Sequence, residues 1–426
     1  MRQQTQEATV QARDVAQTAT DVAPIMATAE TGRKNRALAA MADRLEARKE
    51  DLIAANRNDM KAAAESGLPE KLVSRLGFDE SKIDSRMRAL GKIQRLPDPV
   101  GQTFKTQRRP NGLEVARVRV PLGVILMIYE ARPHVTVNAG AFCLKSGNAA
   151  ILRGGSEAET CNALLGDLWR ESLAEAGLPE DAVQVVSGSH EEVQELLCLK
   201  NHIDLVIPRG GERLIEVVER QSAIPVIKHF AGICHVFLDE DCDLTDAIEI
   251  VLDAKCLMPE VCNAAETLLV SEALADELPR IGEALREAGV TVRGCGRTRA
   301  ALPWAEAAEE EDWSTEYLDM IMSVRVVEEV GEAIEHINRY GSHHTDAIVT
   351  DSLDRARRFV REVDSGVVPV NASTMFCDGE SLGMGAEIGI STDKLHARGP
   401  MGLEDLTTYK HVIHGQGHVL GEGATR

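Results

Sequence analysis

Residues 120–158 read VPLGVILMIYEARPHVTVNAGAFCLKSGNAAILRGGSEA and contain the alternation of elements that decides the fold class. The run from Val124 to Tyr129 is apolar throughout, which is typical of a strand buried on both faces. A helix over 134–145 and a second strand near 149–153 follow, so the stretch predicts a β–α–β unit. Parallel sheets built from such units bind ligands beyond the carboxyl ends of their strands.

The same cadence continues towards the C-terminus. Further strands are expected near 183–186, 203–207, 224–228 and 234–238, with helices over 155–176 and 211–221. This alternation predicts an α/β fold with a parallel sheet covered by helices on both faces. A second α/β unit is expected from about 243 to 370, followed by a glycine-rich, loop-like tail.

Helices are expected in front of the first sheet. Between residues 31 and 60, Leu38, Met41, Leu45 and Leu52 recur every three to four positions, the period of a helix with one buried face. Helical segments continue to about residue 95, where LPDPVG ends them. The stretch RRPNGLEVARVRV then alternates in polarity, which predicts a hairpin strand with one solvated face.

Size and composition limit the class of protein. A chain of 426 residues, 44% of them hydrophobic, is expected to form two or three domains with substantial cores. A formal net charge of −21 argues against nucleic-acid binding, which needs a basic surface. No apolar run approaches the roughly 20 residues of a membrane-spanning helix, so no membrane partner is expected.

The cysteines point to free thiols. There are nine, and they contain no C-x-x-C pair, which argues against a zinc ribbon or a redox pair. No metal site is expected. An odd count without a signal peptide favours reduced cysteines in the cytoplasm.

Two predicted strands end in the same short pattern, an arginine and two glycines that lead into a helix. They lie in ILRGGSEAET (151–160) and VIPRGGERL (206–214). Either turn alone is as well explained by a solvated arginine, but two at successive strand ends favour a phosphate-bearing ligand held by free helix N–H groups. The candidate residues are Arg153, Gly154, Gly155, Ser156, Arg209, Gly210 and Gly211.

Cys262 lies in MPEVCNAAETLLV (258–270), between a proline-containing turn and a run of small residues. A free cysteine is more often an inert small hydrophobe than a nucleophile. Here the small neighbours leave room for a substrate carbonyl, and backbone N–H groups beside Asn263 can face a developing oxyanion. The thiolate is the reactive form, so the nucleophile interpretation requires an electropositive setting.

Two other stretches carry candidate side chains. In ARPHVTVNAG (131–140), Arg132 and His134 follow a buried strand, either as site residues or as a helix start with proline near its first position. In KHFAGICH, Lys228 is followed by His229 and His235, for which structural imidazoles are the default interpretation.

Taken in order, these motifs resemble the γ-glutamyl phosphate reductase family of the aldehyde dehydrogenase superfamily. The resemblance rests on residues 120–158, VIPRGG, VIKHFAGICHVFLD, VCNAAETLLV and VNASTMFCDGESLGMGAEIGISTDKLHARGPMGLEDLTTYK. It covers the chain from about residue 30 to 415. It implies an aldehyde dehydrogenase-like fold of two α/β domains with parallel sheets and a small oligomerisation hairpin.

The resemblance also implies a division of the chain. An NADP-binding domain is expected over 1–103 and 122–240, and a catalytic domain with the cysteine over 241–375. A hairpin at 104–121 and a C-terminal strand within 400–426 are expected to serve oligomerisation, with 376–399 as a return segment. The expected assembly is a homo-oligomer in the cytoplasm, and a glutamate kinase is the candidate protein partner.

The implied reaction is the NADPH-dependent reduction of L-glutamate 5-phosphate to L-glutamate 5-semialdehyde and phosphate, the second step of proline biosynthesis. Cys262 would form the thioester, with Asn263 beside the oxyanion. His229 stands where hydrolytic aldehyde dehydrogenases carry a water-activating glutamate, which fits chemistry without thioester hydrolysis. The alternatives are a reductase of another acyl phosphate or acyl thioester, or an inactive homologue with a binding role.

For the cofactor, the resemblance places Arg153 and Ser156 at the adenosine ribose and Glu316 at the nicotinamide ribose. The turn at 209–211 would meet the pyrophosphate. The chain departs from the family pattern at Met258-Pro259-Glu260 (arginine-proline-glycine in the family), at His134 (asparagine) and at Met375 (arginine). The candidate residues for binding the anionic substrate are Arg132, His134, Lys228 and Lys255.

Overall fold

The apolar run at 124–129 forms β3 (Val124–Tyr129), a central strand of a four-stranded parallel sheet. All six of its residues are buried, as expected for a strand covered on both faces. The sheet has the order β5-β4-β3-β6. Its other strands are β4 (Ala149–Gly154), β5 (Val183–Val186) and β6 (Leu205–Arg209).

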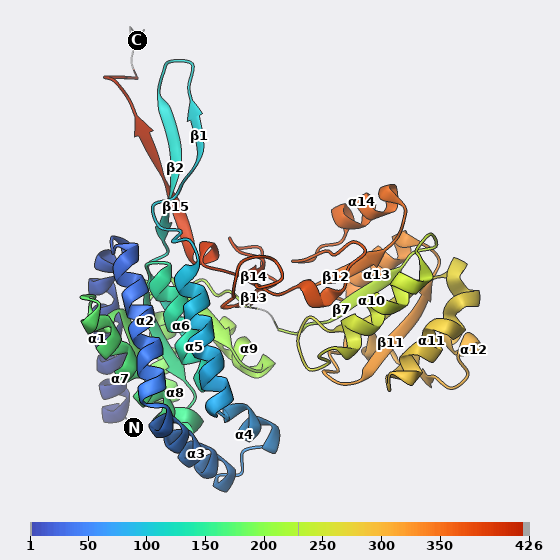
Figure 1. Ribbon diagram of the computed structural model, residues 1–426, viewed down its shortest axis with the longest axis horizontal. Helices are drawn as coiled ribbons and strands as arrows, with labels where there is room; N and C mark the ends of the chain where they lie inside the picture. Colours follow the sequence, from blue (N-terminus) through green and yellow to red (C-terminus); the bar gives the residue numbers. More distant parts are fainter. Residues whose placement is uncertain (1, 229, 421–426) are drawn as a thin grey trace. The chain divides into compact units, whose positions relative to one another are not determined.

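The computed structural model describes residues 2–228 and 230–420, with side chains from residue 11 onward (Figure 1). The chain divides into two units. Unit 1 comprises Met1–Lys228, Met384–Gly389 and Met401–Arg426, and unit 2 comprises His229–Gly383 and Ile390–Pro400. The domain roles implied by the resemblance stay predictions.

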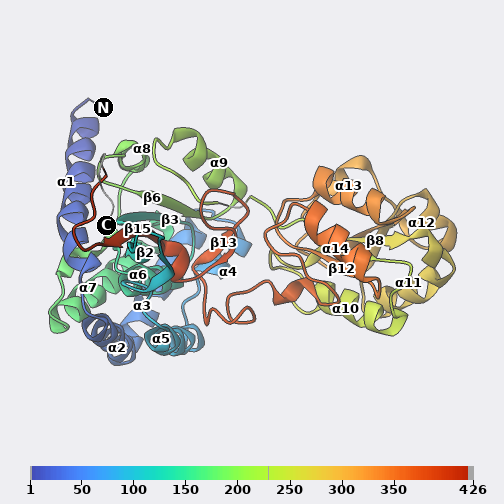
Figure 2. The same ribbon diagram turned by 90° about the horizontal axis from the view of Figure 1, so that it is seen from above.

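Helices cover both faces of the sheet of unit 1 (Figure 2). Alanines of α1 pack with leucines of α8 and Val218 of α9 against one face. Helices α6 and α7 cover the other face, with α2, α3 and α5 outside them. The helices are α1 (Arg2–Ala27), α2 (Thr31–Ala47), α3 (Lys49–Glu65), α4 (Glu70–Leu76), α5 (Glu80–Arg95), α6 (Pro133–Lys145), α7 (Glu159–Glu175), α8 (His190–Cys198) and α9 (Glu212–Gln221).

The predicted hairpin is present in unit 1. Strands β1 (Thr103–Arg108) and β2 (Glu114–Pro121) pair antiparallel, and β15 (Thr407–His414) adds to β2 over its full length. Most residues of β1 and β15 are exposed. The result is a three-stranded sheet that extends away from the helices of unit 1 (Figure 1).

Unit 2 is a second α/β layer structure around a six-stranded parallel sheet of order β10-β9-β11-β8-β7-β12. Its strands are β7 (Cys234–Leu238), β8 (Ala265–Ser271), β9 (Thr291–Gly294), β10 (Glu306–Ala307), β11 (Ile321–Val327) and β12 (Asp346–Val349). Its helices are α10 (Leu244–Cys256), α11 (Leu278–Glu287), α12 (Gly296–Ala301), α13 (Val330–Tyr340) and α14 (Leu353–Glu362). The predicted α/β class with parallel sheets is therefore confirmed.

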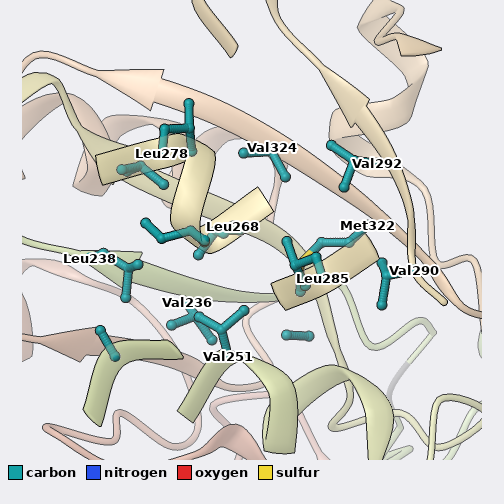
Figure 3. Packing of buried hydrophobic residues seen from close by; sticks show 14 of the residues in the cluster. Val236, Leu238, Val251, Leu268, Leu278, Leu285, Val290, Val292, Met322 and Val324 are labelled. Atoms are coloured by element: carbon teal, nitrogen blue, oxygen red, sulfur yellow. The ribbon is translucent and has the colours of Figure 1, made fainter. Parts of the chain in front are cut away.

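Strand alternation divides the core of unit 2 between two faces. Val236 and Leu268 pack under α10 and α11, where Figure 3 shows them with Val251 and Leu285. Phe237, one residue along β7, points to the opposite face, where α13 and α14 pack. The short elements of the chain are η1 (Ser156–Ala158), η2 (Glu180–Ala182), η3 (Glu272–Glu277), η4 (Glu310–Ser314), η5 (Thr374–Phe376), η6 (Glu404–Leu406), β13 (Gly389–Ser391) and β14 (Gly399–Met401).

One strand expectation was wrong, and a second expected strand joins the other sheet. The segment 224–228 forms only an isolated bridge between Val226 and Val206, because Pro225 has no N–H to donate to a ladder. The segment 234–238 is a strand, but it pairs with β8 and β12 and so belongs to the sheet of unit 2. Its apolar pattern could not reveal which of two sheets it joins.

Candidate functional site

The predicted phosphate-binding turns and the 130–134 segment gather at one edge of the sheet of unit 1. Strands β4, β3 and β6 are parallel neighbours, so the residues that follow them emerge on the same side. These are Ser156 after β4, the stretch 130–134 after β3, and Gly210 and Gly211 after β6. The geometry matches the general rule for ligand sites in open α/β sheets.

A cavity of about 440 Å³ lies at the end of β4 and is lined by Arg153, Gly154, Gly155 and Ser156. Arg153 Nη2 donates to the Gly188 carbonyl at 2.9 Å, while its buried Nε has no hydrogen-bond partner within the described chain. A Cβ at position 154 would lie 2.1 Å from the Asn162 amide, which explains the first glycine. Sequence reasoning missed further lining residues from distant segments, including Gln11 and Glu192.

At the turn after β6, the carboxylate of Glu130 occupies the position expected for an anionic ligand. Gly211 N donates to Glu130 Oε2 at 3.0 Å, directly before α9. A Cβ at Gly210 would lie 2.5 Å from the same oxygen. The start of α9 therefore accepts a carboxylate, as expected of a helix N-terminus.

Arg132 and His134 are placed at the start of α6, with Pro133 at its first position. The helix start is confirmed, and a role of Arg132 and His134 as site residues stays a prediction. Burial, followed by the charges of Arg86 and Arg132, lowers the pKa of His134 to about 3. Lys228, at the end of this part of unit 1, forms an ion pair with Glu219 at 2.9 Å.

In unit 2, Cys262 is half-buried in the loop between α10 and β8. Its carbonyl accepts a hydrogen bond from Cys234 Sγ at 3.2 Å. A Cβ at Gly232 would lie 1.8 Å from the same carbonyl oxygen, so only glycine fits there. The loop thus rests directly on the backbone of the 232–234 segment.

Glu316 meets the same glycine. Its Oε1 accepts from Gly232 N at 2.7 Å, so Gly232 joins Glu316 to the loop that carries Cys262. Gly232 was not predicted as a functional residue. The signal in the sequence was the glycine of HFAGICH, which alone does not tell which backbone approaches it.

The side chain of Asn263 is buried, and its Nδ2 donates to the carbonyls of Met375 (3.2 Å) and Cys377 (3.3 Å). It fastens the 375–377 segment beside the cysteine loop. Among the departures from the family pattern in this region, Met375 is buried, whereas Met258 is 46% exposed.

Lys255 is fully buried and does not face solvent. Its Nζ lies 2.6 Å from Glu266 Oε2, also fully buried, and Glu266 Oε1 accepts from Leu318 N at 3.1 Å. Burial raises the pKa of Glu266 to about 7, although the charge of Lys255 opposes the shift. Leu318 has a φ of 51°, and the ion pair holds this left-handed turn two residues after Glu316.

The structure describes one of the two histidines of KHFAGICH. His229 lies outside the described residues. His235 is fully buried, with Nδ1 2.7 Å from Asp346 Oδ1, which agrees with a structural imidazole. Over the described ranges, no group of three or more His, Cys, Asp or Glu side chains is arranged to hold a metal ion, and no helix is long and apolar enough to cross a membrane.

Comparisons with known proteins show the family to which the chain belongs. The aldehyde dehydrogenase family profile matches residues 1–291. The γ-glutamyl phosphate reductase of Moorella thermoacetica is 51% identical over 95% of this chain and 97% of its own length, and that of Salinibacter ruber is 52% identical over 92% and 90%. The crystal structure of the Thermotoga maritima γ-glutamyl phosphate reductase superposes with a TM-score of 0.93 at 44% identity, covering 96% of this chain and all of that one.

More distant structures share the fold. An acetylating aldehyde dehydrogenase from Geobacillus thermoglucosidasius superposes with a TM-score of 0.70 at 15% identity, over 98% of this chain and 99% of that one. The expected aldehyde dehydrogenase-like fold is therefore confirmed. The chain belongs to the γ-glutamyl phosphate reductase family, within the aldehyde dehydrogenase superfamily of oxidoreductases.

Proposed function

We propose that this protein reduces L-glutamate 5-phosphate to L-glutamate 5-semialdehyde and phosphate with NADPH, as the second step of proline biosynthesis. The names of its relatives support the substrate and the pathway. The observation that carries the mechanism is the grouping of the half-buried Cys262 and Glu316 around Gly232. A cysteine without a catalytic role would not require its backbone to be held by a separate segment such as the one that contains Gly232.

The Cys262 thiolate attacks the acyl carbon of the substrate, and phosphate leaves with the electron pair of the C–O bond. The acyl group is then held as a thioester. NADPH, when bound, supplies the hydride that reduces it. Backbone N–H groups beside Cys262 hold the resulting hemithioacetal oxyanion, while the side chain of Asn263 positions the loop through Met375 and Cys377. Collapse of this adduct releases the aldehyde and regenerates the thiolate.

The cofactor residues are proposed from the strand ends of unit 1. The cavity beside Arg153 and Ser156 suits the adenosine end, and the unpartnered Arg153 Nε suits a phosphate such as the 2′-phosphate of NADPH. Gly210 and Gly211 are proposed to meet the pyrophosphate, which would take the place now held by the Glu130 carboxylate. Glu316 is proposed to hold the nicotinamide ribose.

A second candidate function is the reduction of a different acyl phosphate or acyl thioester. It is favoured by the apolar side chains near the cysteine loop, since Met258 is 46% and Phe376 55% exposed. An inactive homologue with a binding role is the third candidate. For assembly, we propose that the β1-β2-β15 sheet contacts a second copy of the chain, in the cytoplasm, and that a glutamate kinase is a partner.

The reverse reaction tests the main proposal. NADP⁺ should be reduced in the presence of L-glutamate 5-semialdehyde only when phosphate is added. Turnover that needs coenzyme A instead of phosphate would favour the second candidate. No turnover with either acceptor would contradict both.

A further inference from the structure

A buried ion pair joins the two ends of the loop that carries Cys262. Lys255 lies in the last turn of α10 and Glu266 is the second residue of β8, so the two residues stand on either side of the loop. Lys255 Nζ lies 2.6 Å from Glu266 Oε2, and both side chains are fully buried. Tying the ends of a loop together limits the conformations open to it. The ion pair therefore fixes where the cysteine loop begins and ends.

The same carboxylate holds a second loop. Glu266 Oε1 accepts a hydrogen bond from Leu318 N at 3.1 Å. Leu318 belongs to the stretch 315–320, which joins η4 to β11 and contains no helix or strand. Its φ of 51° lies in the left-handed region, where a β-carbon crowds the backbone. Such a conformation persists only where neighbouring groups hold it.

Glu316 lies two residues before Leu318 and is held at a different point. Its Oε1 accepts from Gly232 N at 2.7 Å. Gly232 lies against the cysteine loop, since a Cβ there would be 1.8 Å from the Cys262 carbonyl oxygen. The cysteine loop and the 315–320 loop are thus linked twice, once through Gly232 and once through the buried carboxylate of Glu266.

Stability alone does not explain this ion pair. The desolvation of two buried charges offsets most of their attraction, so an apolar pair of the same size would hold α10 against β8 equally well. An apolar pair would lack an acceptor for Leu318 N. The carboxylate at position 266 is therefore better explained by the backbone group that it binds.

We propose that Lys255 and Glu266 are positioning residues for cofactor binding. Lys255 orients the Glu266 carboxylate, which in turn holds the 315–320 loop. This loop presents Glu316 to the ribose beside the nicotinamide. The inference rests on the proposed function, which assigns Glu316 to that ribose, and adds the residues that place it. It also gives Lys255 a role other than the expected contact with substrate.

Two uncharged double variants test the link. Lys255→Met/Glu266→Gln keeps an oxygen that accepts from Leu318 N, whereas Lys255→Met/Glu266→Met has a side chain of similar length without that oxygen. Calorimetric titration of the full chain with NADPH should give a dissociation constant about 3- to 10-fold higher for the variant without the oxygen, the loss expected for one hydrogen bond. Urea denaturation checks that each variant is folded under these conditions.

A cofactor fragment and a control variant show whether the loss is specific. The fragment 2′,5′-ADP lacks the nicotinamide ribose, so its affinity should be equal in the two double variants. Thr298→Val removes a different buried hydrogen bond of unit 2, from Thr298 Oγ1 to the Val324 carbonyl, and should leave both affinities unchanged. Equal NADPH affinities of the two double variants, or an equal loss for 2′,5′-ADP, would overturn the proposal.

The Glu316→Ala background shows whether Glu266 acts through Glu316. If it does, the difference in NADPH affinity between the two double variants should vanish in that background. A difference of the same size would contradict the proposal, because position 266 would then act on binding by another route. Absence of NADPH binding to the wild type would contradict the proposed function as well. Binding to the wild type with equal affinities of the double variants contradicts this inference alone.

Discussion

The ligand edge of unit 1 and the cysteine loop of unit 2 are built in opposite ways. At the edge of unit 1, Arg153 Nε and His134 Nδ1 are buried without partners in the described chain. Around the cysteine loop, the polar side chains of Asn263 and Glu266 are already bonded to backbone and to Lys255. At the strand ends of unit 1 an unsatisfied donor is available to a ligand, whereas the bonded side chains of Asn263 and Glu266 hold the segments around the cysteine loop in place.

Removal of the fully buried ion pair between Lys255 and Glu266 should have the largest effect on stability. In Lys255→Met, Glu266 loses the partner that opposes its raised pKa, so the buried carboxyl takes up a proton, and the free energy of unfolding should fall by about 3–5 kcal/mol. Urea denaturation of the full chain measures the loss. The double variant Lys255→Met/Glu266→Gln, which removes both charges and keeps an acceptor for Leu318 N, should be clearly more stable than the single variant. Equal stability of the two would show that the ion pair does not support the loop.

Gly232→Ala should act on chemistry more than on binding. The added Cβ would overlap the Cys262 carbonyl, so the thiol must move, and a shift of about 1 Å is expected to lower kcat about 100-fold. The KM for NADPH should change little. Gly296→Ala is the control, since a Cβ there meets nothing within 4 Å. Equal kcat values for the two variants would contradict a role for Gly232 in placing the thiol.

Removing an unsatisfied donor should weaken binding and leave chemistry intact. Arg153→Met should raise the KM for NADPH about 10-fold, with kcat nearly unchanged and a smaller effect on NADH, which lacks the 2′-phosphate. Steady-state kinetics with both cofactors measure the difference. A fall in kcat at constant KM would place Arg153 with the supports instead of the ligands.

The smallest effect concerns an unsatisfied group that no ligand reaches. His336 is buried among aromatic rings, both ring nitrogens lack partners in the described chain, and burial lowers its pKa to about 2. The unfolded chain takes up a proton on this imidazole below about pH 6.5 and the folded chain does not, so stability falls with falling pH. Its share of that loss is about 0.8 kcal/mol between pH 7.5 and 6.

His336→Phe should remove this part of the pH dependence of the free energy of unfolding. The exposed His190→Phe should not. Thermal or urea denaturation at the two pH values measures the difference. Identical pH slopes for wild type and His336→Phe would show that His336 is charged, or otherwise satisfied, in the folded chain.

Local patterns predicted the parts of the molecule that depend on local physics. The apolar run at β3, the strands and helices after it, and the Arg-Gly-Gly turns follow from periodicity and turn chemistry. The turn before Cys262 was expected from Pro259. These features need no information about distant partners.

The rest depends on contacts between distant segments. Gly232 meets Cys262 and Glu316 across separations that no local pattern encodes. Lys255 was predicted to bind the substrate because of its charge. In the structure its ammonium group forms an ion pair with Glu266 on the next strand. The bridge at Val226, in place of a strand, likewise reflects Pro225 and pairing with β6.

The central claim is that Cys262 is the reactive thiol. Alkylation with iodoacetamide, followed peptide by peptide by mass spectrometry, measures the rate at each of the nine cysteines. Cys262 should react faster than the more exposed Cys198. The fraction of activity lost should equal the fraction of Cys262 that is modified. If Cys262 reacts no faster than Cys198, or if Cys262→Ala keeps full activity, the account is contradicted.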